Sequence, residues 1–221
     1  MTYVEFLQAH SGRMIDGTII TVYQFLLSTV VAIGIAILFG LMKLSKNLAV
    51  RSVAIIYIEI FRGTSLLVQL FWIFFVLPLF GIHLDKFTAG FLAVGLNMGA
   101  YGAELVRGAI LAVPQGQWEA AIALNMSSRK RMWRVVLPQA FVIMLPPWGN
   151  LIIEILKGTA LVALISVTDL MFEVRQININ TFLSIEAFGT AIIIYYLIAR
   201  LFVTPVMRAF ENAMSRKIGR A

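Results

Sequence analysis

The chain has 221 residues, of which 60% are hydrophobic and 13% are charged, and its mean hydropathy is +0.90. Soluble domains contain about 45–50% apolar and about 25% charged residues, so this composition excludes an ordinary soluble enzyme. The absence of cysteine excludes disulfides, thiolate metal sites and cysteine nucleophiles. A net charge of +7 on so hydrophobic a chain indicates basic loops against anionic membrane lipid before it indicates nucleic acid.

Five stretches of the sequence are long and apolar enough to cross a bilayer, which needs ~20 mostly apolar residues per helix. We therefore predict an all-α integral membrane protein with five transmembrane helices, built as a single domain over residues 1–221. The predicted spans are Gly17–Met42, Val53–Phe80, Phe87–Val113, Val135–Leu156 and Phe182–Thr204.

A sixth apolar stretch, Gly158–Phe172, is short for a span and fits a re-entrant or interfacial segment better. Lys and Arg gather in alternate loops: Lys43–Arg51, Arg129–Arg134 and the tail from Arg208 onward. Because cytoplasmic loops carry the excess of Lys and Arg, this pattern places the N-terminus outside and the C-terminus in the cytoplasm. A sixth span would move the basic tail outside, which favours five.

The loop between the third and fourth predicted spans, Ala112–Arg134, contains more than a connector requires. Pro114 ends the preceding span, and Glu119–Leu124 is a strongly helix-favouring run that we expect Glu119 to open. Asn125 should end this helix, because Asn tolerates the left-handed conformation. A short helix between two spans suits docking in a groove of a cytoplasmic partner. The alternative is a basic loop that only anchors the chain at the membrane.

The spacing in this loop resembles the "EAA" loop of the membrane subunits of ABC importers. Glu119-Ala120-Ala121 is followed by Asn125 and then by Val135, Leu137 and Pro138, where the family has Gly in place of Asn125 and Ile in place of Val135. Four further strings resemble polar amino acid permeases of the histidine/glutamate/glutamine type: Tyr57–Gln69, Tyr101–Gly108, Leu137–Ala140 and Leu156–Leu161.

The resemblance implies a type I importer permease fold in the bacterial cytoplasmic membrane, and alternating access as the transport mechanism. It also implies the residues that couple transport to an ATPase: Glu119, Ala120, Ala121, Asn125, Leu137 and Pro138. The implied partners are an ATPase dimer inside, a solute-binding protein outside, a second identical or homologous permease chain, and lipid. The implied solute is a polar amino acid or a related zwitterion. The sequence lacks the GxxxxGK[ST] motif and metal-ligand spacing, so ATP and magnesium are expected in the ATPase, and no cofactor in this chain.

Three acid–base pairs share a spacing of three residues, which puts both side chains on one helical face. They are Glu59/Arg62, Glu104/Arg107 and Glu154/Lys157. The first two lie near the predicted cytoplasmic side, where they either neutralise each other beside the headgroups or form a gate connected to the docking loop. The third lies on the outward half of the fourth span, beside a break expected at Gly158. It is either a structural pair or lines the translocation path, where it would complement a zwitterion.

Prolines and glycines within the predicted spans indicate where a helix bends and where two helices pack closely. Pro138, Pro146 and Pro147 should kink or split the fourth span. Gly95, Gly99 and Gly102 are interpreted as close-packing sites. Two functions compete with an importer subunit: a channel or secondary transporter that needs no ATPase, and a membrane scaffold that recruits a protein through Glu119–Arg134.

Overall fold

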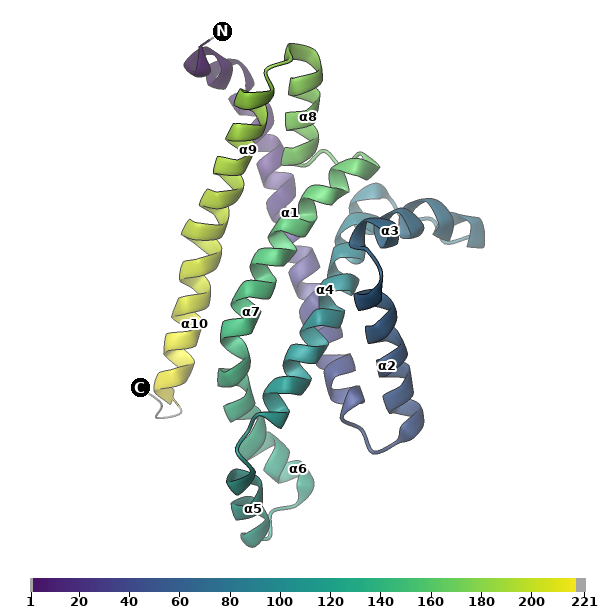
Figure 1. Cartoon of the computed structure of the whole chain (residues 1–221), viewed down its shortest axis with the longest axis vertical. Coiled ribbons are helices and arrows are strands. Elements are labelled where there is room, and N and C mark those ends of the chain that lie inside the picture. Colours follow the sequence, from purple (N-terminus) through teal and green to yellow (C-terminus); the bar gives the residue numbers. More distant parts are fainter. Residues whose placement is uncertain (1, 218–221) are drawn as a thin grey trace.

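The computed structural model describes residues 2–217, and these form a bundle of α-helices without strands. The four long helical segments run roughly along one axis, with the N-terminus and α8 at one end and α5, α6 and the C-terminal end of the described chain at the other (Figure 1). The last residues of the predicted cytoplasmic tail lie outside the described part.

The first helix, α1 (Tyr3–Lys43), begins well before the predicted span. A capping box fixes its start, with Thr2 accepting from the Glu5 backbone and Glu5 accepting from the Thr2 backbone. A helix of 41 residues is about 60 Å long, twice the thickness of a bilayer core. Its first turns therefore extend beyond the apolar span, where Phe6 and Met14 pack against α8 (Leu170–Thr181) and α9 (Ser184–Ile198).

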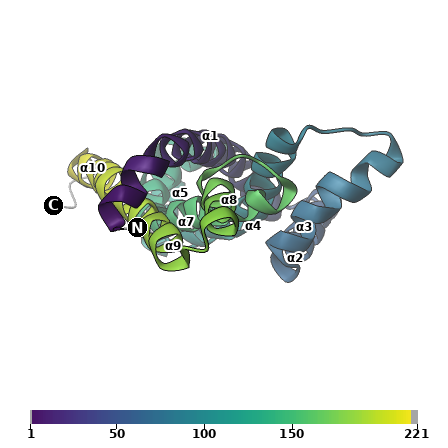
Figure 2. The ribbon, with the colours of Figure 1, turned by 90° about the horizontal axis from the view of Figure 1, so that it is seen from above.

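The second predicted span, Val53–Phe80, is not one helix. It consists of α2 (Leu48–Gly63) and a second arm, Leu66–Phe80, bent by 106° relative to α2. The arm begins with α3 (Leu66–Phe71) and continues as a π-helical turn, Trp72–Val76, and a 3₁₀ turn, Leu77–Phe80. The chain breaks at Gly63 and Thr64 because Gly is a poor helix former and Thr64 is extended, with φ −120° and ψ 154°. Figure 2 shows α2 and α3 to one side of the other helices.

The remaining predicted spans are confirmed as helices with shifted ends. They correspond to α4 (Lys86–Leu111), to the segment Ser128–Ile165 that contains α6 (Ser128–Arg131) and α7 (Leu137–Thr159), and to Ser184–Met214 within α9 and α10 (Thr204–Lys217). Among residues 2–217, four helices are long and apolar enough to cross a membrane, or five if the bent pair counts as one span.

The prolines of the fourth span do not split it, since α7 contains Pro146 and Pro147 as one helix. Three other prolines each follow a π-helical turn by two residues. The wider turn moves the carbonyl that the proline ring would otherwise meet, so α7 and α10 continue past Pro138 and Pro205, whereas the helix with Pro78 ends at Phe80. The pairs are Trp72–Val76 with Pro78, Met132–Val136 with Pro138, and Ala199–Val203 with Pro205.

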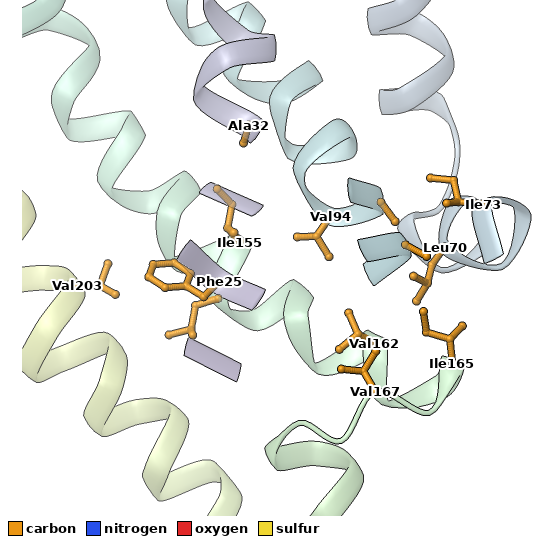
Figure 3. Close-up of a cluster of buried hydrophobic side chains, with 13 residues drawn as sticks. Phe25, Ala32, Leu70, Ile73, Val94, Ile155, Val162, Ile165, Val167 and Val203 are labelled. Atoms are coloured by element: carbon orange, nitrogen blue, oxygen red, sulfur yellow. The ribbon is translucent and has the colours of Figure 1, made fainter. Parts of the chain in front are cut away.

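The largest core cluster binds the bent arm to the bundle. Leu70 and Ile73 from the arm lie beside Val162 and Ile165, and Val94 of α4 lies between them and Ile155 of α7 (Figure 3). Burial of these side chains holds the arm at its sharp angle. The segment Gly158–Phe172 agrees with the expectation that it does not cross as one helix. It contains the end of α7, a 3₁₀ turn (Ala160–Ile165), a left-handed Ser166 and the start of α8.

Candidate functional site

The predicted docking loop forms a compact helical projection at one end of the bundle (Figure 1). Its main element is α5 (Gln115–Ala123), which begins directly after Pro114. Glu119 therefore lies in the middle of the helix and does not open it, contrary to the sequence prediction. Proline is an effective stop for the preceding span, and the residues after it enter the next helix at once.

The end of α5 confirms the prediction for Asn125. Its φ is 53°, in the left-handed region. The backbone N–H of Met126 donates to the Ala121 carbonyl at 3.0 Å, and that of Asn125 donates to the Ile122 carbonyl at 2.8 Å. These two bonds are a Schellman motif, which usually has glycine at the left-handed position. Asn125 thus fulfils the geometric requirement that the resemblance assigns to glycine.

The outer surface of α5 combines one charge with exposed apolar side chains. Glu119 and Ala120 are exposed, while Ala121 is buried against the rest of the loop. Ile122 and Leu124 are 55% and 76% exposed. Exposed apolar side chains beside a charge on a rigid projection are typical of a protein docking surface.

Contacts behind α5 hold the projection in place. The Arg131 guanidinium lies over the Trp118 ring, 5.7 Å from its centroid, and Gln139 donates to the Gln117 side chain at 3.2 Å. Leu137 and Trp118 pack against the cluster that contains buried Val113 and Val136. Pro138 follows at the start of α7, and the Gln139 side chain donates to the Val135 carbonyl at 3.0 Å. The residues of the predicted coupling site therefore belong to one packed unit.

The predicted Glu104/Arg107 pair is present and contains a third member. Glu104 accepts from Arg107 Nε at 3.1 Å and also from Lys43 Nζ. Lys43 is the last residue of α1, so the triad joins the ends of α1 and α4 directly before the projection. Spacing along one helix cannot reveal Lys43, because it comes from a different helix 61 residues away.

The predicted Glu59/Arg62 pair does not form. Among the side chains of residues 2–214, none forms an ion pair with Glu59 or Arg62, and Glu59 is exposed. Arg62 is in the last turn of α2, and its guanidinium lies 5.2 Å from the centroid of the Tyr101 ring. A cation is favoured there by the helix dipole and by the aromatic face, which explains the different partner.

Amide side chains occupy the break between α2 and α3. Asn97 is buried and donates to the Phe61 carbonyl at 2.9 Å and to Gln69 Oε1 at 3.1 Å. Gln69 donates to the same carbonyl at 2.9 Å and to the Thr64 hydroxyl at 2.6 Å. These bonds satisfy a carbonyl freed by the end of α2, a requirement inside a membrane protein. Neither Asn97 nor Gln69 was among the predicted site residues.

The third predicted pair is formed, with Lys157 Nζ 2.7 Å from Glu154 Oε1. Its side chains are 64% and 55% exposed. The α-helix ends at Thr159, one residue after the expected break at Gly158, and the chain continues as a 3₁₀ turn before it turns at Ser166. Gly158 also allows close packing, since a Cβ there would lie 3.3 Å from Leu66 and 3.6 Å from Val94. The Glu154/Lys157 pair therefore precedes Gly158, which packs against Leu66 at the start of the bent arm.

A cavity of about 720 Å³ lies elsewhere, between α1, α7 and α10. Apart from Thr29 and two tryptophans, its lining consists of apolar side chains such as Phe25, Phe141 and Met207. Charged or zwitterionic solutes require hydrogen-bonding or charged partners, so this cavity is unsuited to them.

Comparisons with known proteins agree with this arrangement. Residues 6–216 match the family described as binding-protein-dependent transport system inner membrane component. The chain is 49% identical over 184 residues to a probable amino-acid ABC transporter permease of Sinorhizobium fredii, covering 80% of this chain and 77% of that one. It is 36% identical to the L-cystine transport system permease protein TcyB of Bacillus subtilis, covering 92% and 87%.

The solved structures include a near match to the fold. The crystal structure of an amino acid ABC transporter with histidines superposes with a TM-score of 0.88 at 34% identity, covering 96% of this chain and 99% of that one. The agreement extends over nearly the whole helical bundle. The chain thus belongs to the family of inner-membrane components of binding-protein-dependent transport systems, and it is a multi-pass membrane protein.

Proposed function

We propose that this chain is the membrane-spanning subunit of an ATP-driven importer for a polar amino acid or a related small zwitterion, working by alternating access. Family membership supports the subunit assignment. The solute class is supported by relatives named for amino acids, L-cystine and glutamine. The observation that carries the proposal most strongly is the rigid, partly apolar projection around α5 at one end of the bundle.

ATP hydrolysis belongs to a separate ATPase dimer, which would hold ATP and magnesium. The α5 projection supplies the surface for it, with Glu119 and the exposed Ile122 and Leu124 reaching into its cleft. Movement of α5 would reach the spans through two connections. The first connection is Leu137, which packs with the projection and is the first residue of α7. The second is the Glu104 triad, which joins α4 to α1 next to the projection.

The solute path is assigned to the region of the bent arm. Broken helices that line a cavity are where transporters place solute groups, and the amides of Asn97 and Gln69 lie at this break. Glu154 and Lys157 stand beside it, exposed, with one charge of each sign. A zwitterion carries both charges, so this pair would separate to bind its amino and carboxylate groups. Arg62, at the same break, would act in the gate with Tyr101, whose ring its guanidinium contacts.

The orientation follows from charge and geometry. The projection contains Arg129, Lys130 and Arg131 and lies at the same end as the C-terminal end of α10 (Figure 1). Positive loops favour the cytoplasm, so the N-terminus and α8 would face outside, where a solute-binding protein delivers the solute. A second permease subunit, identical or homologous, would complete the path.

Reconstitution tests the proposal. The chain would be purified with its ATPase and binding protein, placed in proteoliposomes, and supplied with labelled glutamine, L-cystine, glutamate or leucine. We expect uptake of a polar amino acid that requires ATP, binding protein and a functional ATPase. Uptake without ATP would favour a channel or secondary transporter. Stable binding of a cytoplasmic protein without any uptake would favour a scaffold.

A further inference from the structure

A buried carboxyl group lies where α1, α7, α8 and α9 meet, away from the parts used by the proposed function. Asp169 is the N-cap of α8 and is 0% exposed. Its Oδ1 accepts from the Phe172 backbone at 2.9 Å, whereas Oδ2 has no hydrogen-bond partner among the described residues. The surroundings are tight, because a Cβ on Gly17 of α1 would lie 2.9 Å from Leu170 Cα.

The groups around Oδ2 are hydroxyls. The Tyr195 hydroxyl of α9 is buried, has no hydrogen-bond partner at ordinary geometry among the described residues, and lies within reach of the side chains of Asp169, Thr21 and Thr159. Thr159 Oγ1 donates to the Leu156 carbonyl at 2.7 Å and keeps its lone pairs free. Thr21 Oγ1 donates to the Gly17 carbonyl and accepts from the Leu170 backbone, each at 3.0 Å.

No cation neutralises this carboxyl group in the part of the chain that the structure describes. The nearby basic groups are engaged elsewhere, Arg13 with Glu173 at 2.7 Å and Lys86 with the Ser166 carbonyl at 2.7 Å. The segment from Gly158 to Thr168, which leads from α7 to Asp169, carries no charged residue. Apart from Arg13, Glu173 and Tyr195, the charged or titratable side chains on the four packed helices are Tyr3, Glu5, His10, Asp16, Tyr23 and Lys43 on α1, Glu154 and Lys157 on α7, Arg175 on α8, and Glu186 and Tyr196 on α9. None of them forms an ion pair with Asp169.

We propose that Asp169 is a proton-binding site, and that the bound proton ties the start of α8 to the rest of the bundle. A buried carboxylate without a cation is costly, and the usual remedy is to take up a proton. The protonated group would donate from Oδ2 to the Tyr195 oxygen, and Tyr195 would donate to Thr159 Oγ1, which already donates to Leu156. Every buried donor and acceptor in this chain of hydroxyls then has a partner.

The proposal predicts a pH dependence with a definite sign. Burial raises the pKa of Asp169 to about 7, above the ordinary value of about 3.9 in an unfolded chain. Stability from the bound proton is therefore fully present below the unfolded pKa and is lost as the pH rises through about 7. Loss of the proton would loosen the junction of α8 with α1 and α9, at the end of the bundle opposite the α5 projection.

The chain offers a matched control. Asp85 is also a helix N-cap, accepting from the Phe87 and Thr88 backbones at 3.0 Å, but it is exposed. Hydrogen bonds lower the pKa of its carboxyl group. Asp85→Asn should therefore leave the pH profile above pH 5 unchanged, whereas Asp169→Asn should alter it, because the amide mimics the protonated carboxyl.

Two measurements on the full chain in detergent test the proposal. The first is infrared spectroscopy with carboxyl-¹³C-labelled aspartate, which reports only Asp16, Asp85 and Asp169. The band of a protonated carboxyl should be strong at pH 6. Above about pH 7, the ratio of this band to the carboxylate band should fall about tenfold for each pH unit. It should persist in Asp85→Asn. This measurement needs no variant that might fail to fold.

The second measurement is the unfolding midpoint between pH 5.5 and 8.5. The wild type and Asp85→Asn should lose stability as the pH rises, while Asp169→Asn should lose less and become the more stable protein at high pH. The proposal is overturned if no protonated aspartate band exists at pH 6, or if the Asp169→Asn profile runs parallel to that of the wild type.

Discussion

The close contact between α1 and α4 makes a strong prediction about Gly99. A Cβ at this position would lie 2.5 Å from Ile35 Cγ2 and 2.7 Å from Ile35 Cβ. Carbon atoms in contact normally keep ~3.5–4.0 Å, so the two helices would have to separate by about 1 Å. A rotamer change cannot relieve the clash, because Ile35 Cβ is fixed to the backbone of α1.

The expected magnitude follows from two opposing contributions. Overpacking of a tight interface costs about 1–3 kcal/mol, while replacement of a mid-helix glycine by alanine gains about 0.5–1 kcal/mol. Gly99→Ala should therefore destabilise the protein by up to about 2 kcal/mol. Gly108 lies on the same helix with nothing within 4 Å of a Cβ, so Gly108→Ala should gain the helix contribution alone.

Thermal or denaturant unfolding of both variants in the same detergent checks the reasoning. The two single substitutions make the same chemical change on the same helix, so their effects should have opposite signs. If Gly99→Ala raises the unfolding midpoint as much as Gly108→Ala does, the α1–α4 interface is not closely packed at this point, and Gly99 is not a close-packing site.

The remaining predictions concern topology, the turn after α5 and the solute path. Reporter fusions after Lys46 should indicate cytoplasm and those after Asn178 the outside; a cytoplasmic signal at Asn178 would contradict the orientation. Asn125→Gly should transport normally, whereas Asn125→Val should impair ATPase retention, because a β-branched residue at φ 53° costs about 1–2 kcal/mol; equal retention by both variants would show that the turn is unimportant. Lys157→Met should reduce uptake without loss of assembly, and an exchange of the Glu154 and Lys157 charges should recover part of it. Unchanged uptake kinetics in Lys157→Met would leave this pair a structural role.

Length and hydropathy located the spanning helices because burial in lipid requires long apolar runs. They could not reveal the sharp bend after Gly63, because the residues on both sides are equally apolar and two short helices produce the same hydropathy as one. The bend depends on local chemistry at Thr64 and Gln69 and on hydrogen bonds from the Asn97 amide, which reaches the bend from α4. Such tertiary contacts are outside the reach of a periodicity argument.

The candidate site was predictable where neighbours along the chain determine it. Asn125 adopts the left-handed turn that its spacing after Glu119 implied, and Glu104 pairs with Arg107 within one helix. The errors came from long-range contacts and helix starts. Lys43 joins Glu104 across helices, and α5 begins at Gln115 because Pro114 stops one helix and allows the next to start. Asp169 was missed since a lone acid beside apolar residues resembles an ordinary N-cap.

We propose that α5 couples ATP hydrolysis in the ATPase to movement of the membrane spans, and a substitution of Glu119 tests this coupling most directly. An exposed side chain in mid-helix contributes little to folding, so Glu119→Lys should insert and fold normally. If Glu119 pairs with a basic group in the ATPase cleft, loss of that partner costs about 2–5 kcal/mol, which weakens binding by about thirtyfold or more.

The decisive measurement is ATP-driven uptake in proteoliposomes together with copurification of the ATPase, for wild type, Glu119→Lys and Glu186→Lys. Glu186 lies in the first turn of α9, at the opposite end of the bundle, and provides the same change of charge as a control. We expect Glu186→Lys to retain the ATPase, and Glu119→Lys to release it and lose uptake. Wild-type uptake by Glu119→Lys with the ATPase still bound would contradict the account and leave the loop a membrane anchor.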